Sequence, residues 1–283
     1  MRKFPIALLA LAPLAACATV AHDHADAVPQ PGQDAQAAPA REAHAAATPQ
    51  RPLRIDRAAR ARIEHEDMLS QMTFWAQEYT NFPDDIEAAQ KFSEALRKGG
   101  RYQRAAEVAS EALGRNPNDT QLLMTYGLSL VADNRAQDAL RPLALVAHAD
   151  AHDWRSRSAL GVALDQLGRF DEARQAYQEA LAIKPDDPGL LTNVGVSHLL
   201  SGEPEAAEPL LRQAVALPGA PPEARQNLAI AVALQGRFDE AERLERIDLP
   251  PQMVADNMAY LRGLLSDPRR WGDLRRSGNS VQQ

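Results

Sequence analysis

The chain has 283 residues and a formal net charge of −7, with 31 Lys and Arg against 38 Asp and Glu. This acidic balance argues against a nucleic-acid partner, and the single cysteine excludes an intramolecular disulfide framework and a cysteine-based zinc cluster. Apolar residues make up 45% of the chain but aromatic residues only 5%, which favours closely packed helices over a β-sandwich.

The first sixteen residues have the features of a signal peptide. Arg2 and Lys3 form a positive start, and residues 4–14 are an apolar run that is too short to span a bilayer. The run ends in Leu-Ala-Ala directly before Cys17, the only cysteine. This order resembles a bacterial lipobox, which implies that the segment is removed and that Cys17 is lipidated. The alternative is an ordinary secretory signal in which the cysteine occurs by chance.

The residue after Cys17 is Ala18. In bacterial lipoproteins an Asp at this place usually implies retention in the inner membrane. The resemblance therefore implies that this chain is anchored in the outer membrane and faces the periplasm. Several acyl chains on one cysteine anchor firmly, since each buried CH2 contributes about 0.8 kcal/mol.

Residues 18–53 have the composition of a tether. They contain Ala, Pro, Gln, His and Asp with almost no Leu, Ile or Phe, so they cannot bury enough apolar surface to offset their ordering entropy. We expect this segment, from the lipidated Cys17 to residue 53, to be disordered. His22, Asp23 and His24 could bind a metal, but a solvated linker is the favoured interpretation because nothing holds the ligands in place.

The rest of the chain repeats with a constant period. Glycines recur at one place of the register, and the remaining unit has Asn there, the next most tolerant residue in a left-handed turn. These five residues are Gly100, Asn134, Gly168, Gly202 and Gly236. Five positions further on, every unit has an alanine: Ala105, Ala139, Ala173, Ala207 and Ala241. The pattern predicts helical hairpins whose connecting turn requires a positive φ.

Two further features support helical hairpins. Small residues are expected where two antiparallel helices cross, and Gly127, Gly161 and Gly195 stand at one place on the first helices. Asp119 and Asp187 follow the prolines that end two of the second helices. Their side chains can accept hydrogen bonds from the free N–H groups at the start of the next helix.

The pattern resembles the tetratricopeptide repeat, a helix–turn–helix unit with the same period, and residues 154–187 are its best copy. The resemblance implies an all-α fold, a right-handed α-solenoid of about five repeats with capping helices. The expected order is an N-terminal capping helix at 54–85, repeats at 86–119, 120–153, 154–187, 188–221 and 222–249 (degenerate), a C-terminal capping helix at 250–266 and a loose tail at 267–283.

No enzyme motif is present in the sequence. It lacks a glycine-rich phosphate loop, a Gly-x-Ser-x-Gly elbow and a His-Glu-x-x-His pair. His148 and His152 lie four residues apart and could share a metal on a helix, but they fall in the stretch between two units. We therefore expect no catalysis, no cofactor and no metal.

In this family the first helices line a concave groove that usually holds a peptide or a partner helix. Carrying the family's groove positions over to this chain gives a groove whose middle and end are apolar. The expected contact residues are Met124, Leu128, Val162, Thr192, Asn193, Val196, Gln226, Asn227 and Ile230. Asn193 and Asn227 could pair with an extended peptide backbone, or could be solvated or bonded locally. Neighbouring helices could equally bury the apolar residues.

The whole layout resembles the TadD family of Flp/Tad pilus assembly lipoproteins. The most specific part is Leu-Pro-Pro at 249–251, followed by Asn-Met-Ala-Tyr-Leu-Arg at 257–262. The resemblance implies a non-enzymatic outer-membrane adaptor whose partner is the pilus secretin. The alternative is a lipoprotein adaptor of another envelope system: a type IV pilus pilotin, outer-membrane protein assembly or regulation of peptidoglycan hydrolases. A third possibility, from another class, is a metal-dependent hydrolase that uses the histidines.

Overall fold

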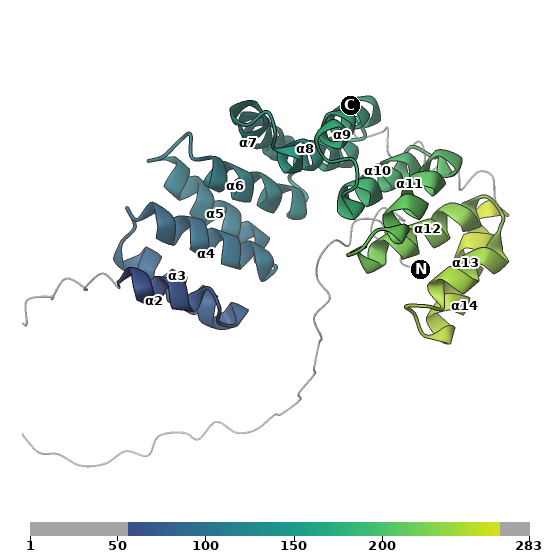
Figure 1. Ribbon diagram of the computed structural model, residues 1–283, viewed down its shortest axis with the longest axis horizontal. Helices are drawn as coiled ribbons and strands as arrows, with labels where there is room; N and C mark the ends of the chain where they lie inside the picture. The colour runs from purple at the N-terminus through teal and green to yellow at the C-terminus, as the bar shows by residue number, and fades with distance from the viewer. Residues whose placement is uncertain (1–55, 267–283) are drawn as a thin grey trace, which may run out of the picture.

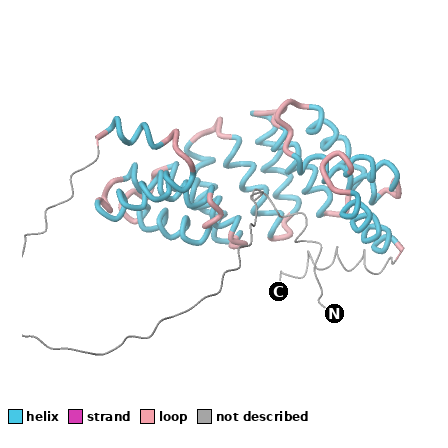
Figure 2. The backbone as a smooth tube through the Cα atoms, turned by 90° about the horizontal axis from the view of Figure 1, so that it is seen from below, coloured by secondary structure: helices cyan, strands magenta, loops and turns pink. Residues whose placement is uncertain are grey.

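The computed structural model describes residues 56–266, which form thirteen α-helices and no strand (Figure 1, Figure 2). The all-α class predicted from the sequence is confirmed. The predicted signal segment 1–16, Cys17 with its predicted tether, and the predicted tail 267–283 lie outside the described residues. Across 56–266, every helix is too short or too polar to cross a membrane.

Five helix pairs follow one another at the constant interval predicted from the sequence. First helices begin at residues 86, 120, 154, 188 and 222, and second helices at 102, 136, 170, 204 and 238. The pairs are α4 (Ile86–Lys98) with α5 (Tyr102–Leu113), α6 (Thr120–Ala132) with α7 (Ala136–Ala149), α8 (Trp154–Gln166) with α9 (Phe170–Ile183), α10 (Pro188–Leu200) with α11 (Pro204–Ala216), and α12 (Pro222–Leu234) with α13 (Phe238–Glu245).

The turn inside each pair places one residue in the left-handed region. The φ angles are 73° for Gly100, 58° for Asn134, 71° for Gly168, 80° for Gly202 and 83° for Gly236. The predicted turn positions are therefore confirmed, including Asn134. Asn tolerates this region better than most residues because its short polar side chain can bond locally.

Small residues lie at the crossing of the two helices, as predicted. A Cβ added to the glycine of the first helix would lie far inside contact distance of a large side chain on the second helix. The pairs are Gly127 with Leu143, Gly161 with Tyr177 and Gly195 with Leu211, at 2.6, 2.5 and 2.6 Å. The hydrogen atom of glycine is thus what allows the two helices to pack this closely.

Aspartates begin four of the first helices. The Asp119 carboxylate accepts the N–H of Leu122 at 2.8 Å, and Asp187 accepts the N–H of Leu190 at 2.9 Å, which confirms the predicted caps. Asp85 and Asp153 hold the same place in α4 and α8. Each cap satisfies a donor that has no partner inside its helix.

The N-terminal cap differs from the single helix expected over 54–85. It consists of α2 (Arg57–Ile63) and α3 (Met68–Asn81), separated by a turn at 64–67. The break has a local cause, because Asp67 accepts the N–H groups of Leu69 and Ser70 and so starts a new helix. At the other end, α14 (Pro251–Leu265) buries one face against α12 and α13.

The first helices lie on the inner side of the curve. Each of them packs on the first helix of the next pair, α4 on α6 and onward to α12, whereas the second helices of successive pairs are spread apart. Helices that approach one another more closely occupy the smaller radius, so the chain forms an arch (Figure 1).

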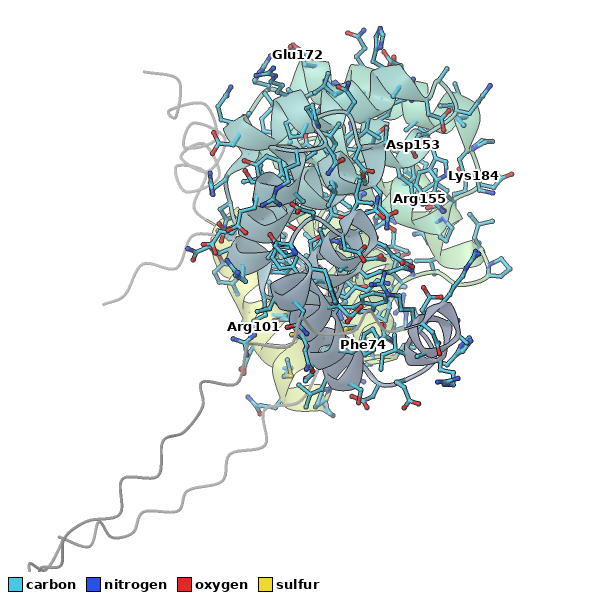
Figure 3. All side chains as sticks on the ribbon, turned by 90° about the vertical axis from the view of Figure 1, so that its left-hand side faces the viewer. Phe74, Arg101, Asp153, Arg155, Glu172 and Lys184 are labelled. Atoms are coloured by element: carbon cyan, nitrogen blue, oxygen red, sulfur yellow. The ribbon has the colours of Figure 1, made fainter. Side chains whose placement is uncertain are left out.

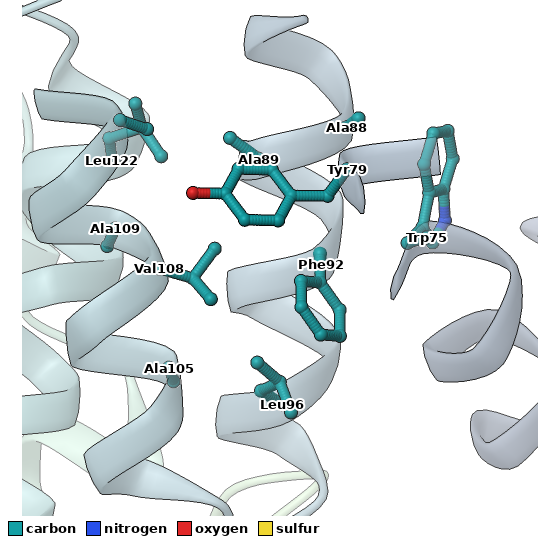
Figure 4. Packing of buried hydrophobic residues seen from close by; sticks show 11 residues of the cluster. Trp75, Tyr79, Ala88, Ala89, Phe92, Leu96, Ala105, Val108, Ala109 and Leu122 are labelled. Atoms are coloured by element: carbon teal, nitrogen blue, oxygen red, sulfur yellow. The ribbon is translucent and has the colours of Figure 1, made fainter. Parts of the chain in front are cut away.

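At the N-terminal end of the arch, Tyr79 of α3 and Phe92 of α4 belong to one buried cluster, and their ring centroids are 5.9 Å apart (Figure 4).

Candidate partner-binding face

One position on the first helices is apolar in four successive pairs. We call these residues the central row: Leu128, Val162, Val196 and Ile230. All four side chains are half-buried. They lie one repeat apart on α6, α8, α10 and α12, and so follow the inner side of the arch. Among the predicted contact residues, these four form a continuous apolar line.

The apolar contact residues differ in how far they take part in the core. Met124 and Leu128 pack against the buried cluster around Leu130 and Leu143. Val162 packs against the same cluster and against the next one along the chain. Val196 and Ile230 lie outside the buried clusters of residues 56–266. Buried clusters therefore hold Leu128 and Val162 in place, whereas no buried cluster of the described residues includes Val196 or Ile230.

Two of the four polar contact residues, Thr192 and Asn193, donate hydrogen bonds within the protein. The Asn193 amide donates to Ser158 Oγ at 3.2 Å, and Thr192 Oγ1 donates to the Pro188 carbonyl at 2.6 Å. Asn227 is only 9% exposed, whereas Gln226 is half-buried. Asn193 therefore joins α10 to α8, and the two asparagines do not form a free ladder on the surface.

Charged residues are unevenly distributed over the first helices. Helix α6 has no charged residue, and α10 has His198 as its only titratable residue. On α8, the exposed Arg155 stacks over the Trp154 ring at 4.8 Å beside the capping Asp153 (Figure 3). Helix α8, between them, also carries Arg157 and Asp165, so only α6 and α10 are free of Lys, Arg, Asp and Glu among these three helices.

A buried carboxylate lies next to the central row. Tyr177 and Ser197 donate hydrogen bonds to the two oxygens of Asp165, at 2.9 and 2.7 Å. Asp165 is 8% exposed, and burial raises its pKa to about 6 against the opposing effect of these two bonds. Its partners lie 12 and 32 residues away, so sequence spacing offered no signal for the trio.

The structure does not bring the two candidate metal-binding histidines onto one helix. His148 lies near the end of α7 and His152 in the loop before α8, and both are exposed. In residues 56–266 no group of three His, Cys, Asp or Glu side chains could hold a metal ion. His22, Asp23 and His24 lie outside the described part of the chain.

Comparison with protein families gives one consistent result. A profile described as TPR repeat matches residues 161–202, and a profile described as tetratricopeptide repeat matches 91–153 and 195–252. Together they cover more than half of the chain.

Curated relatives are similar over parts of their length. A TPR repeat-containing protein of Pseudomonas aeruginosa is 30% identical over 124 residues, which are 44% of this chain and 21% of that protein. One of Dictyostelium discoideum is 29% identical over 112 residues, 37% of this chain and 43% of that protein. The chain therefore spans less than half of either relative, and neither name is that of an enzyme.

Solved structures share the fold. A thermophilic TPR protein of Thermus thermophilus superposes with a TM-score of 0.52 at 24% identity, over 69% of this chain and 97% of that one. MamA of Desulfovibrio magneticus superposes with a TM-score of 0.50 at 20% identity, over 56% and 89%. At these identities the likeness concerns the architecture alone.

Proposed function

The chain belongs to the tetratricopeptide-repeat family, and on that premise we propose that it is a non-enzymatic adaptor that binds a protein partner along its inner side. The observation that carries the proposal is the central row, Leu128, Val162, Val196 and Ile230, which remains half-buried on an array of packed helices. Solenoids of this kind use their concave face for binding. Apolar side chains packed against a core, as Leu128 and Val162 are, bind a partner without a large loss of conformational freedom.

The proposal includes the place of action. Lipidation of Cys17 would anchor the protein in the outer membrane with the repeats in the periplasm. A flexible tether of about 35 residues has a root-mean-square reach of roughly 30 Å. The anchor would then raise the effective concentration of the adaptor near a membrane-bound partner without new contacts. The resemblance of residues 1–17 to a lipobox, the composition of the tether and the sequence at 249–262 support the proposal that the protein assists assembly of a Flp/Tad-type pilus, with the pilus secretin as its partner.

Fractionation of cells tests the anchor. Cys17→Ala should release the protein from the membrane fraction into the soluble periplasm, because the acyl chains have no other attachment point. A variant that still fractionates with the outer membrane would show that the anchor is elsewhere.

Partner capture tests the inner side. Val196→Glu should reduce co-purification of the secretin at least ten-fold, because it places a charge in the middle of the central row. Leu145→Glu is the matched control, since Leu145 lies on the second helix α7 and is 43% exposed. Equal capture by both variants, with unchanged helical circular dichroism, would contradict the proposal.

A further inference from the structure

We infer that the arch has a hinge between its third and fourth helix pairs, α8–α9 and α10–α11, and that protonation of Asp165 closes it. This inference concerns the motion of the chain itself and goes beyond the proposed function. It rests on the sparse packing of α9 on α10, on the scarcity of polar contacts between α9 and the fourth pair, and on the buried carboxylate that lies between the two pairs.

The packing between successive pairs is weakest where α9 meets α10, near the crest of the arch (Figure 1). The second helix of one pair packs extensively on the first helix of the next between α5 and α6, between α7 and α8, and between α11 and α12. The packing of α9 on α10 is much less extensive, whereas α8 and α10 pack on each other as extensively as α6 and α8. The inner contact between α8 and α10 can therefore act as a pivot while the sparse contact between α9 and α10 opens.

Polar contacts between α9 and the fourth pair are also few. Within residues 56–266, the only one joins Arg174 Nη1 to Glu203 Oε1 at 4.0 Å, and this nitrogen is buried without a hydrogen-bond partner. One junction earlier, Arg157 of α8 donates to a carbonyl oxygen of α7 at 3.1 Å. One junction later, Glu208 of α11 pairs with Arg237 at the start of α13. The junctions on both sides are thus fastened by closer polar contacts than the one between α9 and α10.

The pivot itself is held by two hydrogen bonds between α8 and α10. Ser197 donates to Asp165 at 2.7 Å, and Asn193 donates to Ser158 at 3.2 Å. Asp165 also accepts the Tyr177 hydroxyl of α9, so its carboxyl group touches every helix that meets at the junction. A hydroxyl can donate or accept, so both partners can also bond a neutral Asp165. The protonated carboxyl group therefore fits the closed junction.

Ionisation of Asp165 favours the open junction. Burial raises its pKa to about 6, and the two hydroxyls and the charge of Arg174 oppose the rise. Among the other helices that pack on α8, α6 has no charged residue and α7 adds no charge that alters this pKa. The only titratable side chain of α10 is His198, whose Nδ1 lies 2.8 Å from Glu203 Oε2 within the fourth pair.

The direction of the response follows from this shift. A carboxylate that reaches water when the junction opens regains the ordinary pKa of 3.8. The closed form therefore binds the proton more tightly, and its advantage is lost as pH rises through about 6. The difference between the two values limits the change in the ratio of open to closed chains to about a hundred-fold.

The hinge divides the central row into two halves. Val162 lies on α8 and Val196 on α10, so the two residues stand on opposite sides of the pivot. Because the inner contact is kept, opening changes the angle between the two halves of the row without separating them. Protonation of Asp165 thereby sets the curvature of the inner side.

Distances between spin labels, measured by double electron–electron resonance, test the hinge on the full chain. Cys17→Ser first removes the only native cysteine. Labelled cysteines then replace Glu179 of α9 and Gln213 of α11, which span the hinge. The matched control pair is Leu145 of α7 with Glu179, which spans the preceding junction. The three positions lie one repeat apart, and all are exposed. Each pair is measured at pH 5 and at pH 7.5.

We expect a broad distance distribution between positions 179 and 213 at pH 7.5, with a longer component that is about ten-fold less populated at pH 5. The distribution between positions 145 and 179 should be narrow at both values. Asp165→Asn, which is always neutral, should keep the hinge closed at both, whereas His198→Gln should leave the response unchanged. Ser197→Ala removes a bond of the pivot and should populate the longer component at pH 5 as well.

Other outcomes overturn one of the two parts of the inference. Equally narrow distributions for both label pairs at both pH values overturn the hinge. A longer component that does not change with pH, or one that changes equally in Asp165→Asn, overturns control by Asp165, as does a response that only His198→Gln abolishes. If Asp165→Asn lacks native helical circular dichroism, Ser197→Ala decides, and a closed distribution at pH 5 in that variant overturns the role of the carboxyl group.

Discussion

The Tyr177 hydroxyl donates a hydrogen bond to Asp165 at 2.9 Å and thereby ties the second helix of the central pair, α9, to its first helix, α8. Ser197, on α10 of the next pair, donates to the other carboxylate oxygen at 2.7 Å. One buried carboxylate therefore joins three helices from two pairs. It lies where the arch passes from one repeat to the next.

The neighbouring junctions use apolar side chains at these places. Moving the trio by one repeat gives Val131, Leu143 and Ala163 before it, and Leu199, Leu211 and Ala231 after it. Among these three junctions, only the central one thus combines a carboxylate, a phenol and a hydroxyl. A hydrogen-bonded trio is more directional than an apolar one. Its cost is the desolvation of Asp165, which makes this junction sensitive to pH.

Between about pH 4 and pH 6 we expect the Asp165 contribution to stability to fall as pH rises. Burial raises the pKa of Asp165 to about 6, although bonds from Ser197 and Tyr177 and the charge of Arg174 oppose the rise. In the unfolded chain the ordinary pKa is 3.8. The native state therefore keeps a proton that the unfolded state has lost, and the stabilisation is present below the lower value and lost above the higher. The upper limit of this stabilisation by Asp165 is about 3 kcal/mol.

Urea unfolding of the full chain and of Asp165→Asn, followed by circular dichroism from pH 4 to pH 7, measures this effect. Relative to the native sequence, the variant should gain up to about 3 kcal/mol as pH rises across the interval. Glu208 acts in the opposite direction in both proteins. Burial raises its pKa, but bonds from Arg237 and other donors lower it to about 2. The test is therefore the difference in unfolding free energy between the two proteins at each pH, and a difference that does not change with pH would contradict the prediction.

Local features of this fold could be predicted from the sequence, because their causes lie within a few residues. Asn134 occupies a left-handed turn through its own φ preference, and Asp119 caps α6 by reaching three residues along the chain. Asp165 could not be interpreted in this way, since its partners come from α9 and α10. Val162 and Val196 show the same limit, because they hold one register position but only Val162 packs against the buried clusters.

The close crossing of helices predicts opposite effects for two glycines. Gly161→Ala would place a Cβ 2.5 Å from the Tyr177 ring, so we expect a net loss of about 1–2 kcal/mol after the helix propensity of Ala is included. Gly263 lies inside α14 with nothing within 4 Å of an added Cβ. Gly263→Ala should therefore stabilise the protein by about 0.5–1 kcal/mol. If the urea midpoints of both variants moved in the same direction, the close crossing of α8 and α9 would not explain the effect of an added Cβ on stability.

The turns predict a second pair of opposite effects. Asn134→Gly should stabilise the protein by up to about 1 kcal/mol, because Asn134 has a φ of 58° that costs glycine nothing. Gly100→Ala should destabilise it by about 1–2 kcal/mol. Gly100 has a φ of 73° and no atom within 4 Å of an added Cβ, so the cost is that of the backbone alone. Thermal unfolding of both variants measures these changes, and a stabilising Gly100→Ala would refute the backbone explanation.

The N-terminal cap depends on one buried arginine. The Arg60 guanidinium bonds Glu78 at 2.6 Å, Asp85 at 2.7 Å and Glu87 at 2.6 Å, and it lies 5.6 Å from the centre of the Trp75 ring. Glu78 is 1% exposed, so its carboxylate has almost no access to water. Arg60 thereby fastens α2 to α3 and to the start of α4.

Arg60→Ala should therefore loosen the cap. Removal of one partner of a buried ion pair costs about 3–5 kcal/mol, because the remaining charge is left without compensation. Hydrogen exchange of the α2 and α3 amides should then become much faster, with little change in α8 to α11. Arg62→Ala is the control, since Arg62 is exposed and makes no ion pair within residues 56–266. Replacing Arg60 with Met and Glu78 with Leu together should restore much of the protection, and a double variant as labile as Arg60→Ala would show that the cap requires the ion pair itself.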